Sequence, residues 1–492
     1  MSDKPTLTVE QQLRGRCAQL EVEVQHLKAQ LQWLQRKVFG SQSERYEPGQ
    51  ALMDFAGAAA EVPVAPVEVT YQRPAAAPKK PLRLDDAQAL ERLPIEQVVE
   101  ILPDEVRANP GAYERIGEER TVEVDIHPPR LFGRAHVRPK FKLREDRTQA
   151  PVVAKAPERL VSGGYGSAGL VAWVLTSKYV DHLPLYRQEK MLTRWGFAIS
   201  RQTLGEWVGL AEGQLVRVHR QMKAGLLEGP YLQVDETPIR YLDPDGDRTS
   251  REGWMWAISR PGDDVVFEWR LSREHGHALT LLENYEGVLQ SDGYQAYPKW
   301  ALANPGRVHV ACWAHTRRYF ENALSTEPKA GQMLELIQKL YRQERLWDEA
   351  KLLEGRSQAR QEHHQPIYQQ IHQKAQELQN LCLPQSPLGK ACHYLLGHWP
   401  GLQRLLDYDF TRLDNNLMEN AIRPSALGKK NWLFIGSPEA GDRTAIIYSL
   451  VVSCQRHGKD PLAYLRHVLT VLPTLHPTAD LKPLLPKNWQ PV

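Results

Sequence analysis

The chain has 492 residues, which is too long for a single hydrophobic core and predicts about three domains. Its formal net charge is only +3, so any affinity for nucleic acid must come from local patches. We find no signal peptide and no apolar run near the ~20 residues of a membrane span, which predicts a cytoplasmic protein without a membrane partner. Five scattered cysteines predict reduced thiols.

Apolar side chains recur at alternating intervals of four and three between residues 13 and 38. This is the a/d heptad register of a coiled coil, so we expect residues 1–40 to form a homo-oligomer through this stretch. A lone amphipathic helix packed on its own domain is the alternative. Residues 41–92, rich in Ala, Pro and Val in their central part, are predicted to be a linker.

Residues 93–160 predict a small β module. Within it, residues 121–126 alternate between apolar and polar side chains like a half-buried strand, with further strand expected to residue 143. Seven basic side chains and two acidic ones lie between residues 130 and 147. A solvated β face and a phosphate-contacting surface both fit this pattern.

Residues 161–228 are expected to be helical. Gly196 suits a turn, and Ser200 suits the N-cap of a second helix that opens with Arg201 and Gln202. A helix, a short glycine turn and a second helix resemble a helix-turn-helix reader of DNA, although many ordinary helical hairpins share the pattern. Arg201 and Gln202 are therefore candidate DNA-binding residues.

Residues 231–235 form a short apolar run after Gly-Pro and predict a buried strand that ends on Asp235. By itself, an aspartate in this place is more often a turn residue than a ligand. Strands are also expected at 254–259 and 265–269, which would complete an antiparallel meander with the first. A helix over 277–285 then leads to a second short strand ending on Asp292, and a strand at 307–312 opens a further helix.

This order of elements predicts an α/β catalytic core of the ribonuclease H-like fold, built from residues 229–320 and 407–455. The first strand would be central, with the Asp292 strand beside it. Residues 321–406 are predicted to be a helical insertion, and residues 456–492 a C-terminal tail. Asp and Asn residues at 414–416 are expected to cap a helix that carries Glu419.

Asp235, Asp292 and Glu419 would then lie together over one edge of the sheet. Crowded carboxylates raise one another's pKa, and hard divalent cations relieve the crowding because they prefer oxygen ligands. Two Mg²⁺ (or Mn²⁺) ions in such a cluster can clamp the attacking and leaving oxygens of a phosphoryl displacement. The three carboxylates are therefore candidate catalytic and metal-binding residues.

Several neighbours of these carboxylates are candidates too. His315 opens a helix near the cluster and is an auxiliary candidate beside the scissile phosphate. Its pairing with Cys312 suggests zinc, but zinc needs four ligands and no second pair is clearly spaced to supply them. Three basic residues follow Glu419 and either bind DNA phosphates or form a solvated face: Arg423, Lys429 and Lys430.

Eight motifs occur in the order expected for one family: 39–44, 177–188, 200–204, 233–237, 291–294, 312–315, 414–416 and 428–434. Through them the sequence resembles the IS66 family of insertion-sequence transposases over nearly its whole length. The resemblance implies a DDE catalytic triad at Asp235, Asp292 and Glu419 and Mg²⁺-dependent cleavage and transfer of DNA strands. It also implies element ends and target DNA as partners, together with accessory proteins of the same element. The insertion is expected either to serve as a scaffold or to hold end DNA.

One departure from the family pattern concerns the module at 93–160. Family members usually carry two Cys-x-x-Cys pairs there that resemble a zinc ribbon, and this chain has no cysteine between residues 93 and 160. We therefore expect no structural zinc. An inactive DNA-binding remnant and a ribonuclease H-like nuclease without strand transfer stay open as alternatives, although the intact carboxylates favour an active transposase.

Overall fold

The computed structural model describes residues 95, 98, 100, 102, 104–112, 129–141, 144, 150–243 and 249–491. The predicted coiled coil and linker, and the strand expected at 121–126, lie outside these ranges. The chain divides into two units, residues 1–130 and 131–492. In the first unit the described elements are α3 (Asp104–Ala108) and the 3₁₀ helix η1 (Pro110–Ala112). The second unit begins with a short antiparallel pair, β1 (Lys140–Phe141) and β2 (Val152–Val153).

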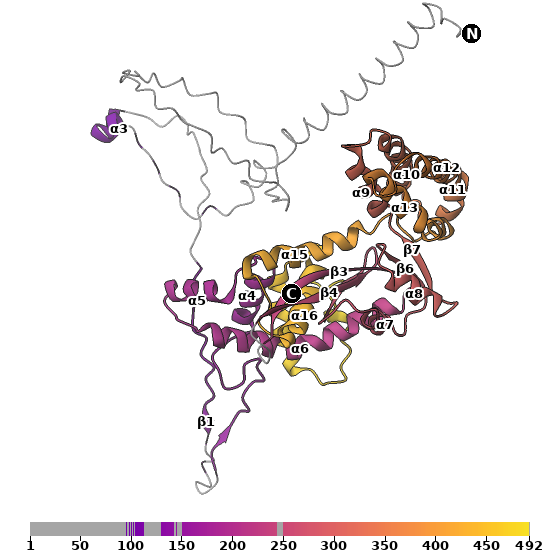
Figure 1. Cartoon of the computed structure of the whole chain (residues 1–492). Coiled ribbons are helices and arrows are strands. Elements are labelled where there is room, and N and C mark those ends of the chain that lie inside the picture. The colour runs from indigo at the N-terminus through magenta and orange to yellow at the C-terminus, as the bar shows by residue number, and fades with distance from the viewer. Residues whose placement is uncertain are drawn as a thin grey trace, which may run out of the picture. The chain divides into compact units, whose positions relative to one another are not determined.

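A five-stranded sheet forms the centre of the second unit (Figure 1). Its strands run in the order β5-β4-β3-β6-β7. The antiparallel meander and the placement of the Asp292 strand beside the first strand are both confirmed, because β4 pairs antiparallel with β3 and β5 while β6 pairs parallel with β3 and β7. The bounds are β3 (Tyr231–Leu242), β4 (Ser250–Ser259), β5 (Val265–Arg270), β6 (Val288–Ser291) and β7 (Val308–Ala311).

The prediction that β3 ends on Asp235 is wrong, because the strand continues to Leu242. Its antiparallel pairing with β4 extends from Gln233 to Leu242, whereas its parallel pairing with β6 covers Tyr231 to Gln233. Pro238 has no N–H for a ladder, and beyond it Leu242 donates to the carbonyl of Ile435. Asp235 therefore lies inside a strand, immediately after the point where the parallel neighbour leaves.

Helices cover the sheet and its edges. The edge strand β5 lies against α16, where the hydroxyls of Ser449 and Ser453 accept hydrogen bonds of 2.8 Å from the backbone N–H groups of Phe267 and Val265. These serines are one helical turn apart, so they match alternate residues of the strand. The remaining helices of this part are α4 (Ala168–Tyr179), α5 (Leu185–Arg194), α6 (Arg201–Leu227), α7 (His275–Leu281), α8 (Ala296–Leu302), α15 (Asn416–Trp432), α16 (Pro438–Arg456) and α17 (Pro461–Val471).

The helix expected at 277–285 is shorter than predicted, since α7 ends at Leu281. The segment after residue 456 packs on the rest of the second unit: α17 contacts α4, and two 3₁₀ turns, η3 (Leu472–Thr474) and η4 (Lys482–Leu484), follow it. No helix in the described part of the chain is long and apolar enough to cross a bilayer.

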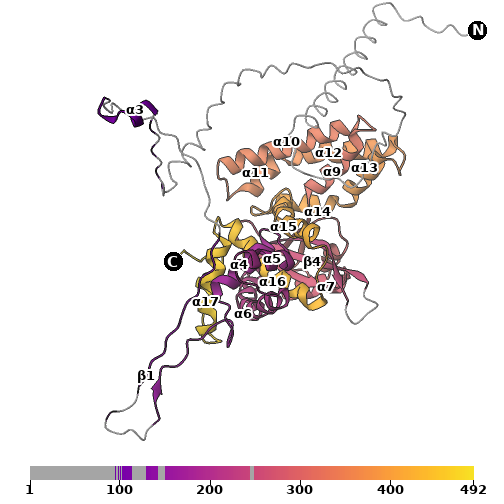
Figure 2. The ribbon, with the colours of Figure 1, turned by 90° about the vertical axis from the view of Figure 1, so that its left-hand side faces the viewer.

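A second hydrophobic cluster lies in the helices between β7 and α15 (Figure 2). A buried arginine, Arg360, links them: it binds both carboxylate oxygens of Glu344 and the carbonyls of Leu405, Tyr408 and Thr411. The chain returning toward α15 is thereby fixed to the bundle. The helices are α9 (Trp313–Leu324), α10 (Ala330–Glu349), α11 (Arg356–His363), α12 (Gln365–Leu381), α13 (Pro387–Gly397), α14 (Trp399–Gln403) and η2 (Arg404–Asp407).

Candidate active site

Three carboxylates from three elements face a common region. Asp235 is half-buried on β3, Asp292 follows β6, and Glu419 lies in the first turn of α15, which packs along β3 (Figure 1). Burial holds the pKa of Asp235 well above its usual range, and the charges of Glu236, Asp292 and Glu419 raise it further. The fold thus brings the three predicted carboxylates into electrostatic reach of one another.

Glu419 is held by two residues of α9. The guanidinium of Arg318 donates to both of its carboxylate oxygens, at 3.2 and 3.0 Å, and His315 Nε2 lies 3.7 Å from one of them. His315 and Arg318 are three positions apart and so share a helix face. Within the described ranges, no three His, Cys, Asp or Glu side chains form a group able to hold a metal ion. Glu419 is therefore bound to Arg318 and does not close a compact cluster with the two aspartates.

His315 is half-buried, and its buried Nδ1 has no hydrogen-bond partner among the residues that the structure describes. Burial lowers the pKa of His315, while the negative charges of Glu419 and Asp292 act in the opposite direction. The lowered pKa favours the neutral imidazole at neutral pH. A neutral ring can accept a proton on one nitrogen, which is the property that an auxiliary base requires.

A fourth carboxylate, Glu236, follows Asp235 on β3, and successive side chains of a strand point to opposite faces. The side chain of Glu236 is fully buried and accepts a hydrogen bond from Tyr297 at 2.6 Å and two from Arg273, at 2.9 and 2.5 Å. Arg273 also lies over the ring of Tyr294, 4.1 Å from its centroid, and 3.9 Å from the carboxylate of Asp292. Burial and the charge of Asp292 raise the pKa of Glu236, and Arg273 and Tyr297 oppose that rise.

The start of α15 is tied directly to β3. The side chain of Asn415 is buried and donates to the carbonyl of Val234 at 2.9 Å, and its backbone N–H donates to the sulfur of Cys312 at 3.2 Å. The predicted cap is therefore only partly right: Asn415 is the N-cap residue but makes no side-chain capping bond. Asp414 instead accepts from Asn416 N. These bonds position Glu419 relative to Asp235.

Two buried glutamines join the same segment to the sheet. Gln233 Nε2 donates to the carbonyl of Asp414 at 3.0 Å, and Gln290 Nε2 donates to the carbonyl of Arg412 at 2.7 Å. The two side chains also bind each other at 3.0 Å. Amide side chains suit this place because they can both donate and accept, which a buried joint between a sheet and a loop requires.

The candidate DNA-binding residues lie on α6 and α15, and Arg423 is one helical turn after Glu419 on α15. Arg201 and Gln202 are exposed in the first turn of α6. This helix is the second of the α5–turn–α6 hairpin, in which Gly196 has a positive φ. On α15, Arg423 and Lys430 are exposed. Lys429 is half-buried, donates to the carbonyl of Pro238 at 2.9 Å, and has its pKa lowered by burial.

Sequence reasoning did not single out Glu236, Arg273, Tyr297 or Arg318. Two of them had a local signal, because Glu236 follows Asp235 directly and Arg318 is one helical turn after His315. Arg273 lies in the loop after β5 and Tyr297 on α8, where no periodic pattern marks them. Only the tertiary structure brings these two to Glu236.

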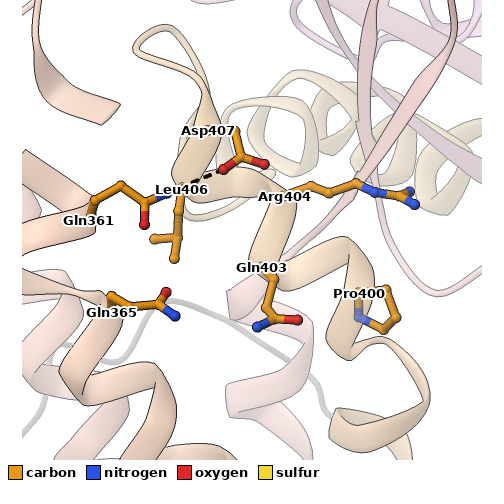
Figure 3. A pocket seen from close by; sticks show the side chains of 7 residues that line it. All are labelled: Gln361, Gln365, Pro400, Gln403, Arg404, Leu406 and Asp407. Carbon is orange, nitrogen blue, oxygen red and sulfur yellow. Dashed lines mark hydrogen bonds between the residues drawn. The ribbon is translucent and has the colours of Figure 1, made fainter. Parts of the chain in front are cut away.

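A polar cavity of about 370 Å³ lies elsewhere, on the helices of the second hydrophobic cluster (Figure 3). Gln361 donates to Asp407 across it at 3.2 Å. None of the three candidate catalytic carboxylates contributes to its lining, which consists of Gln361, Gln365, Pro400, Gln403, Arg404, Leu406 and Asp407.

Comparison with known proteins gives consistent matches along the chain. Residues 163–443 match the model of the transposase IS66 family, residues 449–487 the IS66 C-terminal element, and residues 26–98 a model described as "Transposase C of IS166 homeodomain". The uncharacterized protein y4jD of Sinorhizobium fredii is 32% identical over 504 residues, covering 98% of each chain. A second uncharacterized protein of that organism, y4qI, is 30% identical over 490 residues, covering 95% of this chain and 89% of its own.

Proposed function

The chain belongs to the IS66 transposase family, and we propose that it is a DNA transposase that uses Asp235, Asp292 and Glu419 to cleave and transfer strands at the ends of its element. The observation that carries this assignment is the convergence of the three carboxylates from β3, β6 and α15. The raised pKa of Asp235 supports it, because burial and the charges of the neighbouring carboxylates penalise the ionised form of Asp235, and a divalent cation would relieve that penalty.

The strand order supports a ribonuclease H-like core. Three antiparallel strands are followed by two parallel ones on the other side of β3, so Asp235 lies on β3 and Asp292 directly follows the adjacent strand β6. The helical segment between β7 and α15 would be an insertion into that core. In this proposal it holds end DNA, and the bonds of Arg360 fix its return path toward Glu419.

The carboxylates fit a divalent cation chemically. Their oxygens are the ligands that Mg²⁺ and Mn²⁺ prefer, and Asp235 lies in a setting where burial and like charges penalise its ionised form. Asp235 and Asp292 would hold the ions, and Glu419 would join them on releasing Arg318. Bound cations would supply an activated nucleophile and stabilise the leaving oxygen.

The surrounding side chains have distinct tasks in this proposal. The neutral imidazole of His315 accepts a proton on Nε2, which lies near Glu419, and later returns it. Arg318 binds a phosphate of the substrate once Glu419 is released, because guanidinium forks pair equally well with carboxylates and phosphates. Glu236 and Tyr297 fix the orientation of Arg273 beside Asp292.

DNA binding is assigned to two surfaces. Arg201 and Gln202 at the start of α6 would read bases or phosphates in the manner of a helix-turn-helix, and Arg423 and Lys430 on α15 would contact backbone phosphates near the carboxylates. Lys429 would contribute through its charge, with its amine already bonded to Pro238. Residues 13–38 would bring two copies together, and small proteins of the same element are possible further partners.

The test is cleavage of DNA that carries the element's ends, with Mg²⁺ or with EDTA. Asp235→Asn should abolish Mg²⁺-dependent cleavage while circular dichroism stays unchanged. Asp243→Asn is a matched control, because Asp243 directly follows the same strand but forms an ion pair with Arg251 and is not one of the three candidate carboxylates. Full cleavage by Asp235→Asn would refute the catalytic assignment. Cleavage without joining to target DNA would indicate a nuclease, and DNA binding without any cleavage by the wild type would indicate an inactive remnant.

A further inference from the structure

A stack of three rings lies beside the candidate active site. Tyr319 of α9 stacks on Tyr394 of α13 with ring centroids 4.2 Å apart and planes 21° from parallel. Tyr394 stacks in turn on His398, again at 4.2 Å and with planes 28° from parallel. Such parallel stacks bury aromatic area on the inner rings and leave the outer face of the last ring available.

The inner end of the stack is fixed to the loop that carries Asp292. A Cβ atom on Gly293 would lie 2.7 Å from both Tyr394 Oη and His398 Nε2, which is closer than van der Waals contact. The two side chains are therefore packed against this glycine. His398 Nδ1 is bonded to the carbonyl of Tyr394 at 2.8 Å, and its Nε2 lies 3.4 Å from the carbonyl of Gly293. The rings are therefore held in place next to a catalytic carboxylate.

The outer end of the stack is open. Tyr319 is 41% exposed, and in the described part of the chain the ring that stacks on it is that of Tyr394. Tyr319 lies four positions after His315, so both side chains project from the same face of α9. A flat aromatic surface thus stands near His315 and Glu419 and points to solvent.

Exposed cations lie on both helices of the stack, and two of the three are paired with carboxylates. Arg317 and Arg318 precede Tyr319 on α9, and Lys390 lies one turn before Tyr394 on α13; all three are exposed. Arg317 is paired with Glu321 at 2.7 Å, and Arg318 with Glu419. A planar ligand attached to phosphates complements such a surface, because its ring can stack while its phosphates meet the guanidinium groups.

We propose that the outer face of Tyr319 stacks on an unpaired nucleobase of the DNA strand that enters the carboxylate site. Bases within a duplex have both faces covered by their neighbours, so this platform selects a base that is unstacked or at a strand end. Such stacking would hold the strand beside Asp292 without reading its sequence, because every base has an aromatic face. The role rests on the proposed function, since it places a DNA strand at these carboxylates.

Full-length protein in EDTA should be titrated with two DNA probes that share one strand, which carries 2-aminopurine near its end. In the forked probe the partner strand leaves this end unpaired, and in the other probe it pairs with the whole strand. Tyr319→Ala should weaken binding of the fork by about five- to 150-fold, the range expected for loss of one base–aromatic stack. Binding of the paired probe should change less than twofold. Tyr319→Trp should retain fork binding and the change in 2-aminopurine fluorescence.

Leu324→Ala is the matched control, since Leu324 is 38% exposed near the end of the same helix but carries no ring. Equal fork binding by Tyr319→Ala and wild type would overturn the proposal, and so would equal losses on both probes. An unchanged circular dichroism spectrum of Tyr319→Ala, together with retained fork binding by Tyr319→Phe, would exclude misfolding as the cause of the weaker binding. Because these titrations need no cation, absence of Mg²⁺-dependent cleavage by the wild type would refute the proposed function while leaving the stacking result intact.

Discussion

Replacing Arg360 by leucine should destabilise the helical bundle between β7 and α15 by about 3 kcal/mol. Arg360 is fully buried, and its guanidinium binds both oxygens of Glu344, at 2.7 and 3.0 Å. Removing one partner of a buried ion pair costs roughly 3–5 kcal/mol, because the other charge is left without compensation. We expect the lower end of that range because Arg356 lies 3.7 Å from Glu344 and partly neutralises it.

Hydrogen exchange followed by mass spectrometry measures this cost within the bundle itself. A loss of 3 kcal/mol corresponds to a roughly hundredfold larger opening equilibrium, since about 1.4 kcal/mol is a factor of ten. Peptides from α10 to α13 should therefore exchange about a hundredfold faster, while those from the β3–β4 hairpin should change little. Arg345→Leu, an exposed change one residue after Glu344 on α10, should alter exchange less than threefold.

A second substitution separates charge from packing. In Arg360→Leu combined with Glu344→Leu no buried charge is left unpaired, so the double variant should recover part of the loss even though the carbonyls of Leu405 and Tyr408 lose their donor. If Arg360→Leu exchanged within threefold of the wild type, or if the double variant lost at least as much as the two single variants together, the buried-pair argument would be wrong.

Three further predictions concern other parts of the chain. Burial lowers the pKa of His364 from 6.5 to about 3, so between these pH values the unfolded chain binds a proton that the folded chain does not bind. The free energy of unfolding should therefore fall as the pH drops through this range. In His364→Phe the fall should be smaller when unfolding is measured against pH. Asn415→Ala removes the bond to Val234 and should reduce cleavage at least tenfold with a stability loss of about 1–3 kcal/mol, whereas unchanged cleavage would show that this bond does not position Glu419. Deletion of residues 1–40 should lower the sedimentation coefficient to that of a monomer, and an unchanged oligomer would exclude self-association through this stretch.

Much of the sheet was predictable because its signals are local. Short apolar runs bounded by glycine and proline marked β3 and β6, and a tight turn joined β4 to β5. The end of β3 was placed at Asp235 because the apolar run stops there, whereas the pairing with β4 continues through Pro238 to Leu242. In the structure the parallel neighbour has already left before Pro238, so the missing N–H of this residue breaks no ladder with β6.

The candidate site was predictable in part for the same reason. Asp235 and Asp292 each come at the end of a short apolar run, and Glu419 follows a run of capping residues, so each has a local signal in the sequence. Arg273 reaches Glu236 across 37 positions, and Arg318 reaches Glu419 across 101. Ion pairs of this separation depend on how elements pack, which no local pattern in a single sequence encodes.

The hydrogen bonds from β5 to the serines of α16 can form only late in the synthesis of the chain. Val265 reaches Ser453 across 188 positions, so during synthesis the outer strand β5 emerges long before the helix that covers it. Until then its N–H groups are available to any other extended chain, and an open strand edge is a common start of aggregation. Fragments of the gene that stop before α16 would therefore yield insoluble protein, which would make complete translation a condition for obtaining the catalytic domain in soluble form.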